Sequence, residues 1–300
     1  MNDQFLTELQ NVMGGSGIFM EEPMKKHTTF RVGGPADVLV QPDETALAAI
    51  LALCRQYHVS YSFIGNGSNL LVGDKGIRGV VIEMTDPMGN IEVDGTKITA
   101  QAGAMLSKIA NTAASNGLGG MEFAAGIPGS VGGAVVMNAG AYGGEIRAVC
   151  RWSQEMLPDG TLVRREGVSQ GFGYRTSVFQ HTDGVIVRAC FALQPGDPGI
   201  IRETMRELMT RRTVSQPLDL PSAGSAFKRP QGGYAAALIE SAGLKGLTVG
   251  GAQVSEKHAG FVVNRGGATA ADVLELLRQV QQRVLEHSGI RLEPEIRLWD

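Results

Sequence analysis

The chain has few cysteines, little net charge and no long hydrophobic run, and each shortage excludes a class of protein. Its three cysteines, Cys54, Cys150 and Cys190, are widely spaced and have no neighbouring metal ligands, which indicates reduced core thiols in a cytoplasmic protein and neither a disulfide framework nor a metal site. A formal net charge of −3 and a pI near 6.0 give no basis for binding nucleic acid. Residues 1–15 carry acidic side chains and no apolar core, so we expect no export signal.

Glycine, in contrast, is abundant. The chain has 41 glycines in 300 residues, about twice the usual share of roughly 7%, and many fall in residues 117–145, the glycine-rich segment. Nothing between Glu122 and Glu145 is charged, and Pro128 stands in the middle. Glycine and proline at this density disfavour the helix that a membrane span requires, so we expect no membrane insertion. The segment is too apolar for a flexible linker because it contains Ile127, Val131, Val135, Val136 and Met137.

We therefore predict buried, irregular backbone that a ligand approaches closely. Glycine permits such an approach because it has no side chain and tolerates positive φ. Bare backbone N–H groups suit phosphate oxygens, and uncharged walls suit a flat heteroaromatic ring. The glycine-rich segment is thus a candidate binding site for a cofactor.

A second glycine loop, Gly-Asn-Gly-Ser-Asn at residues 65–69, follows a predicted strand as phosphate loops do. It is not a Walker loop, because no Gly-Lys-Ser/Thr follows, and it lacks the third glycine and the following helix of a Rossmann fingerprint. Alone it is also compatible with a plain Asn-Gly turn. Two glycine-rich loops on adjacent domains favour a shared phosphate-bearing cofactor, with Arg31 and the following Val-Gly-Gly-Pro as a third wall of the same site.

Turn-forming residues divide the chain into three predicted parts, residues 1–86, 87–197 and 198–300. Asp43 and Thr269 are predicted helix N-caps, and Gly289 is predicted to end the last helix. The predicted helices are 43–54, 105–116, 200–212, 234–241 and 269–288. The predicted strands are 36–41, 61–64, 70–72, 79–84, 91–93, 97–100, 149–157, 161–165, 185–193, 252–254, 260–263 and 291–299.

Three further stretches hold polar residues that a site could use. Residues 172–177 place Arg175 beside Tyr174, which is also typical of an ordinary packing loop. Residues 221–230 surround Ser225 with small residues before two cations. They lack the Gly-x-Ser-x-Gly elbow and any nearby Asp/His pattern, so nothing supports a hydrolase nucleophile. Residues 291–297 alternate as a strand does, with Glu293 and Glu295 on the same face. An edge strand with solvated charges would show the same pattern.

Taken together, these stretches resemble one family, the UDP-N-acetylenolpyruvoylglucosamine reductases, also called UDP-N-acetylmuramate dehydrogenases. The resemblance extends from His27 to Ile296, and so many motifs in one order are not expected by chance. The matching stretches are residues 27–36, 65–71, 126–133, 138–142, 174–177, 223–228, 257–264 and 293–296.

The resemblance implies an α+β fold. Residues 1–86 and 87–197 would form a two-part FAD-binding module of the vanillyl-alcohol-oxidase-like (PCMH-type) fold, and residues 198–300 a C-terminal α+β substrate-binding domain. FAD would be held without a covalent link, and NADPH would be the co-substrate. The implied cofactor contacts are Arg31, Gly65, Asn66, Gly67, Ser68, Asn69, Gly126, Ile127, Pro128, Gly129, Ser130, Gly132, Gly133, Asn138, Ala141 and Tyr142.

The implied reaction belongs to peptidoglycan precursor synthesis in the cytoplasm, and so to building the cell wall and to cell shape, the cell cycle and cell division. NADPH reduces FAD, and hydride then passes to the terminal methylene carbon of an enolpyruvyl nucleotide-sugar. The family's pattern implies that Arg175 pairs with the substrate carboxylate and that Ser225 protonates the neighbouring carbon. Glu295, next to that carboxylate, is expected to have a raised pKa and to share a proton.

The chain resembles the shorter of the family's two forms. Between Tyr174 and Ser225 there is no room for the extra substrate-covering loop of the longer form, whose tyrosine contacts the substrate diphosphate. Lys228, Arg229 and His258 are our candidates to share that role, and Tyr174 is a further candidate for substrate binding.

Two other functions remain open on the sequence alone. An oxidase of small alcohols with oxygen as acceptor has the same fold, but it requires neither Arg175 nor Ser225. A non-enzymatic flavin redox sensor leaves Ser225 and Glu295 without a role.

Overall fold

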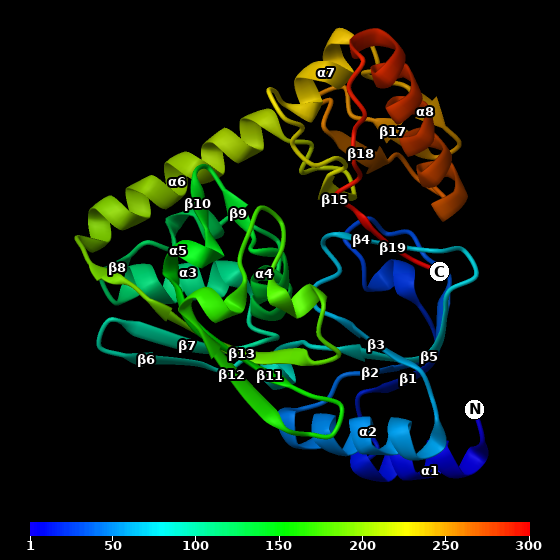
Figure 1. Cartoon of the computed structure of the whole chain (residues 1–300), viewed down its shortest axis with the longest axis vertical. Helices are drawn as coiled ribbons and strands as arrows, with labels where there is room; N and C mark the ends of the chain where they lie inside the picture. Colours follow the sequence, from blue (N-terminus) through cyan, green and yellow to red (C-terminus); the bar gives the residue numbers. More distant parts are fainter. The chain divides into compact units, whose positions relative to one another are not determined.

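A computed structural model describes residues 1–300, which form two compact units that interleave along the sequence (Figure 1). Unit 1 comprises residues 1–20, 38–66 and 79–211, and unit 2 comprises residues 21–37, 67–78 and 212–300. Each unit has its own hydrophobic core. The units do not follow the three predicted parts, since 21–37 and 67–78 join the last third of the chain. The three-part division itself stays a prediction.

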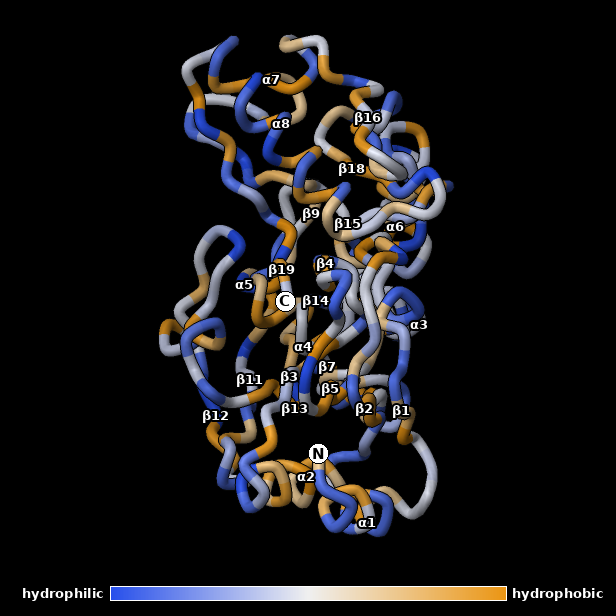
Figure 2. Tube along the Cα trace, turned by 90° about the vertical axis from the view of Figure 1, so that its right-hand side faces the viewer, coloured by the Kyte–Doolittle hydropathy of each residue, from blue (hydrophilic) through white to orange (hydrophobic).

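A four-stranded sheet, with two helices of unit 1 beside it, has the strand order β1-β2-β5-β3, with β3 parallel to β5. Strands β1, β2 and β5 each have residues in both units. The elements are α1 (Asp3–Val12), β1 (Ile18–Pro23), β2 (Pro35–Val40), α2 (Glu44–Tyr57), β3 (Tyr61–Ile64) and β5 (Ile77–Glu83). The predicted cap of α2 is confirmed, because the Asp43 carboxylate accepts a hydrogen bond from the Ala46 N–H at 2.8 Å. Helices α1 and α2 lie side by side, and hydrophobic residues recur along α2 (Figures 1 and 2).

A five-stranded antiparallel sheet forms the other layer of unit 1, in the order β12-β11-β13-β7-β6. Its strands are β6 (Ile91–Asp94), β7 (Lys97–Gln101), β11 (Cys150–Met156), β12 (Leu162–Glu166) and β13 (Val185–Ala192). Strands β7 and β13 are neighbours although they are far apart in the sequence, with Ala100 opposite Ala189. The pairing therefore closes a long excursion of the chain, which carries α3 (Leu106–Ser115), the glycine-rich segment and the Arg175 loop.

The glycine-rich segment is more regular than predicted. It contains β8 (Leu118–Gly119), η3 (Glu122–Ala124), α4 (Val131–Met137), β9 (Gly140–Ala141) and β10 (Gly144–Glu145), and α5 (Ile146–Val149) follows it directly. The prediction of irregular backbone is wrong for residues 131–137. Val131, Ala134 and Val135 are buried on one side of α4, and burial of that side outweighs the roughly 1 kcal/mol that each helical glycine costs.

Unit 2 is built on a four-stranded antiparallel sheet in the order β15-β18-β17-β16. Its elements are β4 (Leu70–Val72), β15 (Ser222–Ser225), α7 (Ala235–Ser241), β16 (Thr248–Val249), β17 (Ala252–Val254), β18 (Phe261–Asn264), α8 (Ala270–Ser288) and β19 (Arg297–Trp299). The predicted ends of α8 are confirmed: Thr269 and Asp272 form a capping box, and Gly289 has φ 72°.

Residues 67–78 are tied to the last third of the chain by two features of unit 2. Strand β4 pairs in parallel with β19, which places Leu70 opposite Arg297. The Asp74 carboxylate accepts hydrogen bonds from the first two N–H groups of α8, those of Ala270 and Ala271, at 2.8 and 3.0 Å. Such a carboxylate stabilises the N-terminal end of a helix.

Two sequence predictions need correction. The predicted strand 291–299 is a strand only at β19, since Pro294 has no N–H to donate and Phe227 and Pro294 form just an isolated bridge. No element is predicted before residue 36, yet α1 and β1 are present. Asn2 caps α1 through the Phe5 N–H, and Phe5 and Leu9 bury one face of it.

The remaining elements are four 3₁₀ turns, one short strand and the long helix α6. They are η1 (Met24–Lys26), η2 (Asp86–Met88), η4 (Gly167–Gln170), η5 (Val178–Gln180), β14 (Gln194–Pro195) and α6 (Pro198–Ser215). None of the helices combines the length and the apolar character that crossing a bilayer would require.

Candidate functional site

Strained backbone marks several of the predicted site residues. Six non-glycine residues have positive φ, and four of them are predicted to bind cofactor or substrate: Arg31 at 54°, Asn138 at 43°, Tyr142 at 52° and Arg175 at 55°. Such a conformation costs of order 1 kcal/mol or more outside glycine and persists only where neighbouring groups hold it. Each of the two units therefore has local contacts that fix these residues.

In unit 1 the two predicted phosphate loops meet. The Asn66 side-chain amide donates to the Pro128 carbonyl at 2.7 Å, and the Leu106 N–H donates to the Gly129 carbonyl at 2.9 Å. A Cβ added to Gly65 would lie 2.2 Å from Ser130 Oγ. Any other residue at position 65 would therefore displace Ser130, so the backbone contact between the loops depends on glycine.

Two features of this contact fit a bound phosphate-bearing group. Ser130 is buried, and its Oγ has no hydrogen-bond partner within the protein, although buried hydroxyls are normally paired. Gly133, in the first turn of α4, is exposed, and a Cβ there would meet nothing within 4 Å. Packing gives no reason for a glycine at position 133, so its missing side chain leaves open space in the first turn of α4, the helix that Ser130 precedes.

Substituting Gly133 with alanine separates its effect on protein stability from its effect on cofactor binding. Alanine favours a helix by about 0.8–1.0 kcal/mol over glycine, so we expect the cofactor-free protein to become more stable by up to that amount. The added methyl group occupies the open space, so the affinity for FAD should fall about tenfold or more, or about 1.4 kcal/mol. Urea unfolding and FAD fluorescence titration measure the two quantities.

The matched control is Asn111→Ala, at an exposed position of α3 in the same unit. It raises helix propensity in a similar way and should leave the affinity for FAD unchanged. An unchanged affinity in Gly133→Ala would mean that the space beside α4 holds no cofactor.

Arg175 lies at the tip of a tight turn in unit 1. Gly173 and Thr176 exchange backbone hydrogen bonds at 3.0 and 3.3 Å, with Tyr174 and Arg175 between them. Tyr174 is 56% exposed, and the Arg175 guanidinium lies 5.5 Å from its ring centroid. The turn thus presents a cation and an aromatic ring on a short, hydrogen-bonded support.

Ser225 and Glu295 are brought together by the backbone of unit 2. Ser225 ends β15 opposite Phe261, and the next residue, Ala226, accepts a hydrogen bond from the Glu295 N–H at 2.9 Å. Ser225 is exposed and Glu295 is partly buried. A hydroxyl and a carboxyl group on neighbouring backbone are a suitable pair for proton transfer.

Asn69, a predicted cofactor contact, holds the Glu295 segment in unit 2. Its side-chain amide donates to the Glu295 carbonyl at 3.1 Å, and its own carbonyl accepts from the Arg297 N–H at 3.0 Å. Gly67 is required for a similar reason, because a Cβ there would lie 2.1 Å from the His27 carbonyl oxygen. The second half of the 65–69 loop thus supports unit 2 itself.

Arg31 is fixed by a residue that received no predicted role. The Asn264 side-chain amide donates to the Phe30 and Arg31 carbonyls at 3.2 and 3.3 Å, and its oxygen accepts from the Gly266 and Ala268 N–H groups. Asn264 lies within the 257–264 motif, which was the only sequence signal for it.

The predicted substrate contacts of unit 2 already have partners within the protein. Lys228 pairs with the Glu293 carboxylate, and the Arg229 guanidinium lies 4.1 Å from the Tyr234 ring centroid. His258 Nδ1 accepts a hydrogen bond from the Gly260 N–H at 3.2 Å, and burial lowers the pKa of His258 below its ordinary 6.5. A lowered pKa favours the neutral ring at pH 7, and because Nδ1 accepts a hydrogen bond, Nε2 is the nitrogen that can donate one.

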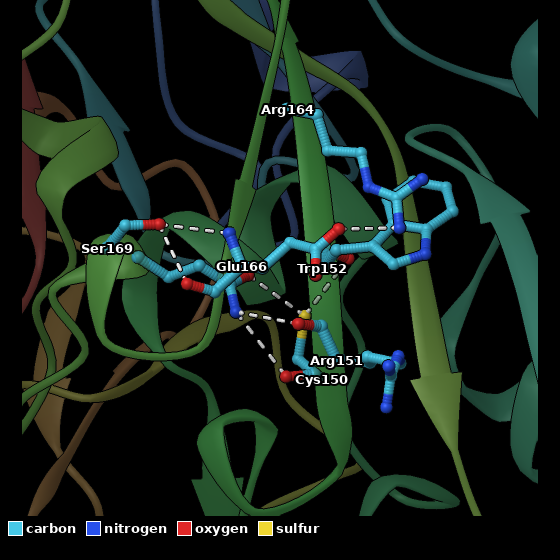
Figure 3. Close-up of polar contacts among 7 residues, drawn as sticks. Cys150, Arg151, Trp152, Arg164, Glu166 and Ser169 are labelled. Atoms are coloured by element: carbon cyan, nitrogen blue, oxygen red, sulfur yellow. Dashed lines mark hydrogen bonds and ion pairs between the residues drawn. The ribbon is translucent and has the colours of Figure 1, made fainter.

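The cysteines offer no competing site. All three are buried and unpaired, as predicted. Figure 3 shows Cys150 near Trp152 and Arg164, and the Arg164 guanidinium lies 4.3 Å from the indole centroid. The Cys150 thiol donates to Gln170, and burial raises its pKa to about 12. Burial also raises the pKa of Cys54 to about 11, so neither is a thiolate nucleophile at neutral pH.

The predicted site residues are divided between the units. Unit 1 holds Gly65, Asn66, Gly126, Ile127, Pro128, Gly129, Ser130, Gly132, Gly133, Asn138, Ala141, Tyr142, Tyr174 and Arg175. Unit 2 holds Arg31, Gly67, Ser68, Asn69, Ser225, Lys228, Arg229, His258 and Glu295. The individual roles predicted for them remain predictions.

Comparison with known proteins identifies relatives along the whole chain. A family model described as FAD binding domain matches residues 35–166, and one described as UDP-N-acetylenolpyruvoylglucosamine reductase, C-terminal domain, matches residues 216–299. A UDP-N-acetylenolpyruvoylglucosamine reductase from Clostridium botulinum (strain Hall) is 48% identical over 297 residues, which cover 98% of this chain and 96% of the relative.

Solved structures agree with these matches. A UDP-N-acetylenolpyruvylglucosamine reductase from Thermus caldophilus superimposes with a TM-score of 0.81 at 37% identity, covering 94% of this chain and 98% of that one. An alkyldihydroxyacetonephosphate synthase reaches a TM-score of 0.50 at 16% identity over 65% of this chain and 41% of its own, which supports the fold alone. The predicted FAD-binding module of the PCMH-type fold is thereby confirmed.

Proposed function

Because the chain belongs to the UDP-N-acetylenolpyruvoylglucosamine reductase family, we propose that it reduces UDP-N-acetylglucosamine enolpyruvate to UDP-N-acetylmuramate, an intermediate of peptidoglycan synthesis. NADPH is the reductant and FAD the cofactor. The observation that carries the proposal is the backbone pairing that sets Glu295 beside the segment of Ser225, with the Glu295 N–H 2.9 Å from the Ala226 carbonyl. Neither rival function requires that pair of residues.

The FAD-binding module has residues in unit 1 that suit the cofactor. Gly65 and Asn66 would hold its phosphates together with the unpaired Oγ of Ser130, in the space that Gly133 leaves open. No residue suggests a covalent link, so we propose that FAD is released intact on denaturation. When bound, FAD accepts hydride from NADPH and delivers it to the substrate.

Arg175 is proposed to bind the carboxylate of the enolpyruvyl group. Hydride addition at the terminal methylene carbon leaves negative charge on the neighbouring carbon and on the carboxylate. A guanidinium held in a hydrogen-bonded turn stabilises that charge without reorganising in the transition state.

Ser225 is proposed to donate its Oγ proton to the carbon next to the carboxylate and then to regain a proton from water. A serine hydroxyl is a weak acid, but an enolate carbon is basic enough to accept its proton when the hydroxyl is held in place. Glu295 would stand near the substrate carboxylate, where two ionised groups repel each other. We propose that its pKa is raised and that it shares a proton with the intermediate.

The nucleotide-sugar is proposed to contact Tyr174, Lys228, Arg229 and His258. Lys228 and Arg229 are the cations for its diphosphate, and neutral His258 donates through Nε2. We also propose a cytoplasmic location, which the three buried, unpaired cysteines support.

Lys228→Met tests the diphosphate contact. Loss of one charge-assisted hydrogen bond costs roughly 1.5–3 kcal/mol, so the KM for the nucleotide-sugar should rise about ten- to a hundredfold and far more than the KM for NADPH. Steady-state kinetics measures both. Glu293→Gln is the control, since it removes the partner of Lys228 and should leave the nucleotide-sugar KM unchanged or lower it. Equal effects of Lys228→Met on both substrates would place Lys228 in the folding of unit 2.

One experiment separates the proposed function from its two rivals. NADPH oxidation is followed under nitrogen, with and without the enolpyruvyl nucleotide, on purified protein whose flavin content is known. Turnover that depends strictly on the nucleotide supports the reductase. Turnover that requires oxygen in place of the nucleotide identifies an oxidase, and a flavin that is reduced but not turned over identifies a sensor.

A further inference from the structure

We infer that Asn138 is a positioning residue for Arg175, a role that rests on the proposed function of that arginine. Asn138 is 1% exposed and ends α4 with a φ of 43°. Its Nδ2 donates to the Gly173 carbonyl at 2.9 Å and to the Glu145 carboxylate at 3.0 Å. Its Oδ1 accepts from the Arg147 N–H at 2.8 Å.

These bonds use both N–H groups of the amide. The side chain therefore has no donor left for a cofactor, which was its role by resemblance. Instead it joins the end of α4 to two loops, the turn of Arg175 and the start of α5 after the β9–β10 hairpin. Tyr142 and Gly143 are the two residues of the hairpin turn, with φ of 52° and 87°. A two-residue turn of the I′ type requires positive φ at both positions.

The Arg175 turn depends on the same end of α4 through two more contacts. Ser177 Oγ donates to the Val136 carbonyl at 2.7 Å, and Gln180 Nε2 donates to both the Val136 and Arg175 carbonyls, at 2.9 and 3.0 Å. Asn138 is the contact on the other side of the turn, at Gly173. Together they hold Arg175 at a φ of 55°, which an isolated turn would not maintain.

Asparagine suits this position for two reasons. It tolerates the left-handed conformation better than most side chains do, and it supplies two donors and an acceptor on one short stem. The other end of α4 carries Ser130 and Gly133. The same seven-residue helix thus supports the proposed phosphate contacts at one end and Arg175 at the other.

Asn138→Asp tests the inference because it keeps the side-chain shape and the acceptor Oδ1. It replaces the donor Nδ2 with an oxygen that faces the Gly173 carbonyl and the Glu145 carboxylate. Displacing a catalytic cation by about 1 Å costs up to about 10²-fold. We expect reoxidation of the reduced flavin by the enolpyruvyl substrate to slow about 10- to 100-fold, with reduction by NADPH changed less than about threefold. Asn138→Gly, which keeps the left-handed backbone without strain, gives the same pattern if the aspartate variant does not fold.

A double-mutant cycle shows whether Asn138 acts through Arg175. In an Arg175→Met background, Asn138→Asp should not slow reoxidation further. Hydrogen exchange provides a readout that does not depend on activity: the amides of residues 173–177 should exchange faster in Asn138→Asp, and those of 131–137 should not. The control is Thr182→Val, which removes a 2.7 Å hydrogen bond to Glu155 from the same unit without touching the turn.

Two results would overturn the positioning role: unchanged exchange at residues 173–177, or a full additional loss of rate when Asn138→Asp is combined with Arg175→Met. A wild-type flavin that the enolpyruvyl substrate does not reoxidise would instead contradict the proposed function, and the exchange measurement would still test Asn138.

Discussion

Replacing Ser225 with alanine is expected to slow reoxidation of the reduced flavin by the enolpyruvyl substrate about 10²–10⁴-fold. That is the usual contribution of a positioned general acid, about 3–5 kcal/mol. Hydride transfer from NADPH to the flavin needs no proton from Ser225, so the rate of flavin bleaching should remain nearly unchanged. Stopped-flow absorbance follows the two half-reactions separately.

Ser222→Ala is the matched control, because it removes the same atom from the first residue of the same strand, β15. Both half-reactions should keep their wild-type rates in this variant. If Ser225→Ala slows both half-reactions equally, Ser225 shapes the site and donates no proton. If reoxidation is unimpaired, Ser225 has no part in the proton transfer and Glu295 becomes the better candidate for the acid.

Arg175→Met is expected to slow the same half-reaction about 10²–10³-fold, which is the usual cost of removing one preorganised group that stabilises developing negative charge. Methionine preserves much of the side-chain length but has no charge. Affinity for the substrate should fall as well, because the carboxylate loses its cation. Reduction of the flavin by NADPH should continue at close to the wild-type rate, since no substrate carboxylate is present in that step.

Two further arginine variants make this prediction sharper. Arg164→Met removes a guanidinium that stacks on Trp152 in the same unit and should leave both half-reactions unchanged. Arg175→Gly suits the φ of 55°, and added guanidinium ion should restore part of its lost rate. Rates of Arg175→Met that match the wild type would contradict the assignment of the carboxylate to Arg175.

The local elements of this protein could be predicted from its sequence because their signals are local. Asp43 and Thr269 cap helices through N–H groups three residues ahead, and glycine after a periodic apolar run ends a helix in any context. The two glycine loops were recognised in the same way. A glycine in such a loop indicates that another group lies too close for a side chain. At Gly65 the structure shows that this group is the Ser130 hydroxyl.

Two predictions from local patterns were wrong. Glycine content predicted irregular backbone at residues 131–137, yet α4 forms because Val131, Ala134 and Val135 are buried on one side. The strand pattern at 291–299 was interrupted because Pro294 lacks an N–H and the segment finds only scattered partners. The first result follows from burial that outweighs intrinsic propensity. The second follows from Pro294 itself, whose missing N–H the alternation pattern did not take into account.

The sequence by itself singled out the candidate site residues: the glycine loops, Arg175, Ser225 and Glu295 all stand in short motifs. Only the tertiary structure decided which of them are neighbours. Glu295 meets Ala226 and Asn69 because β19 pairs with β4 across most of the chain, and Asn138 reaches Gly173 because α4 packs against β13 and η5, which follow the Arg175 turn. Pairings of such long range depend on the burial of whole strands, which no single motif encodes.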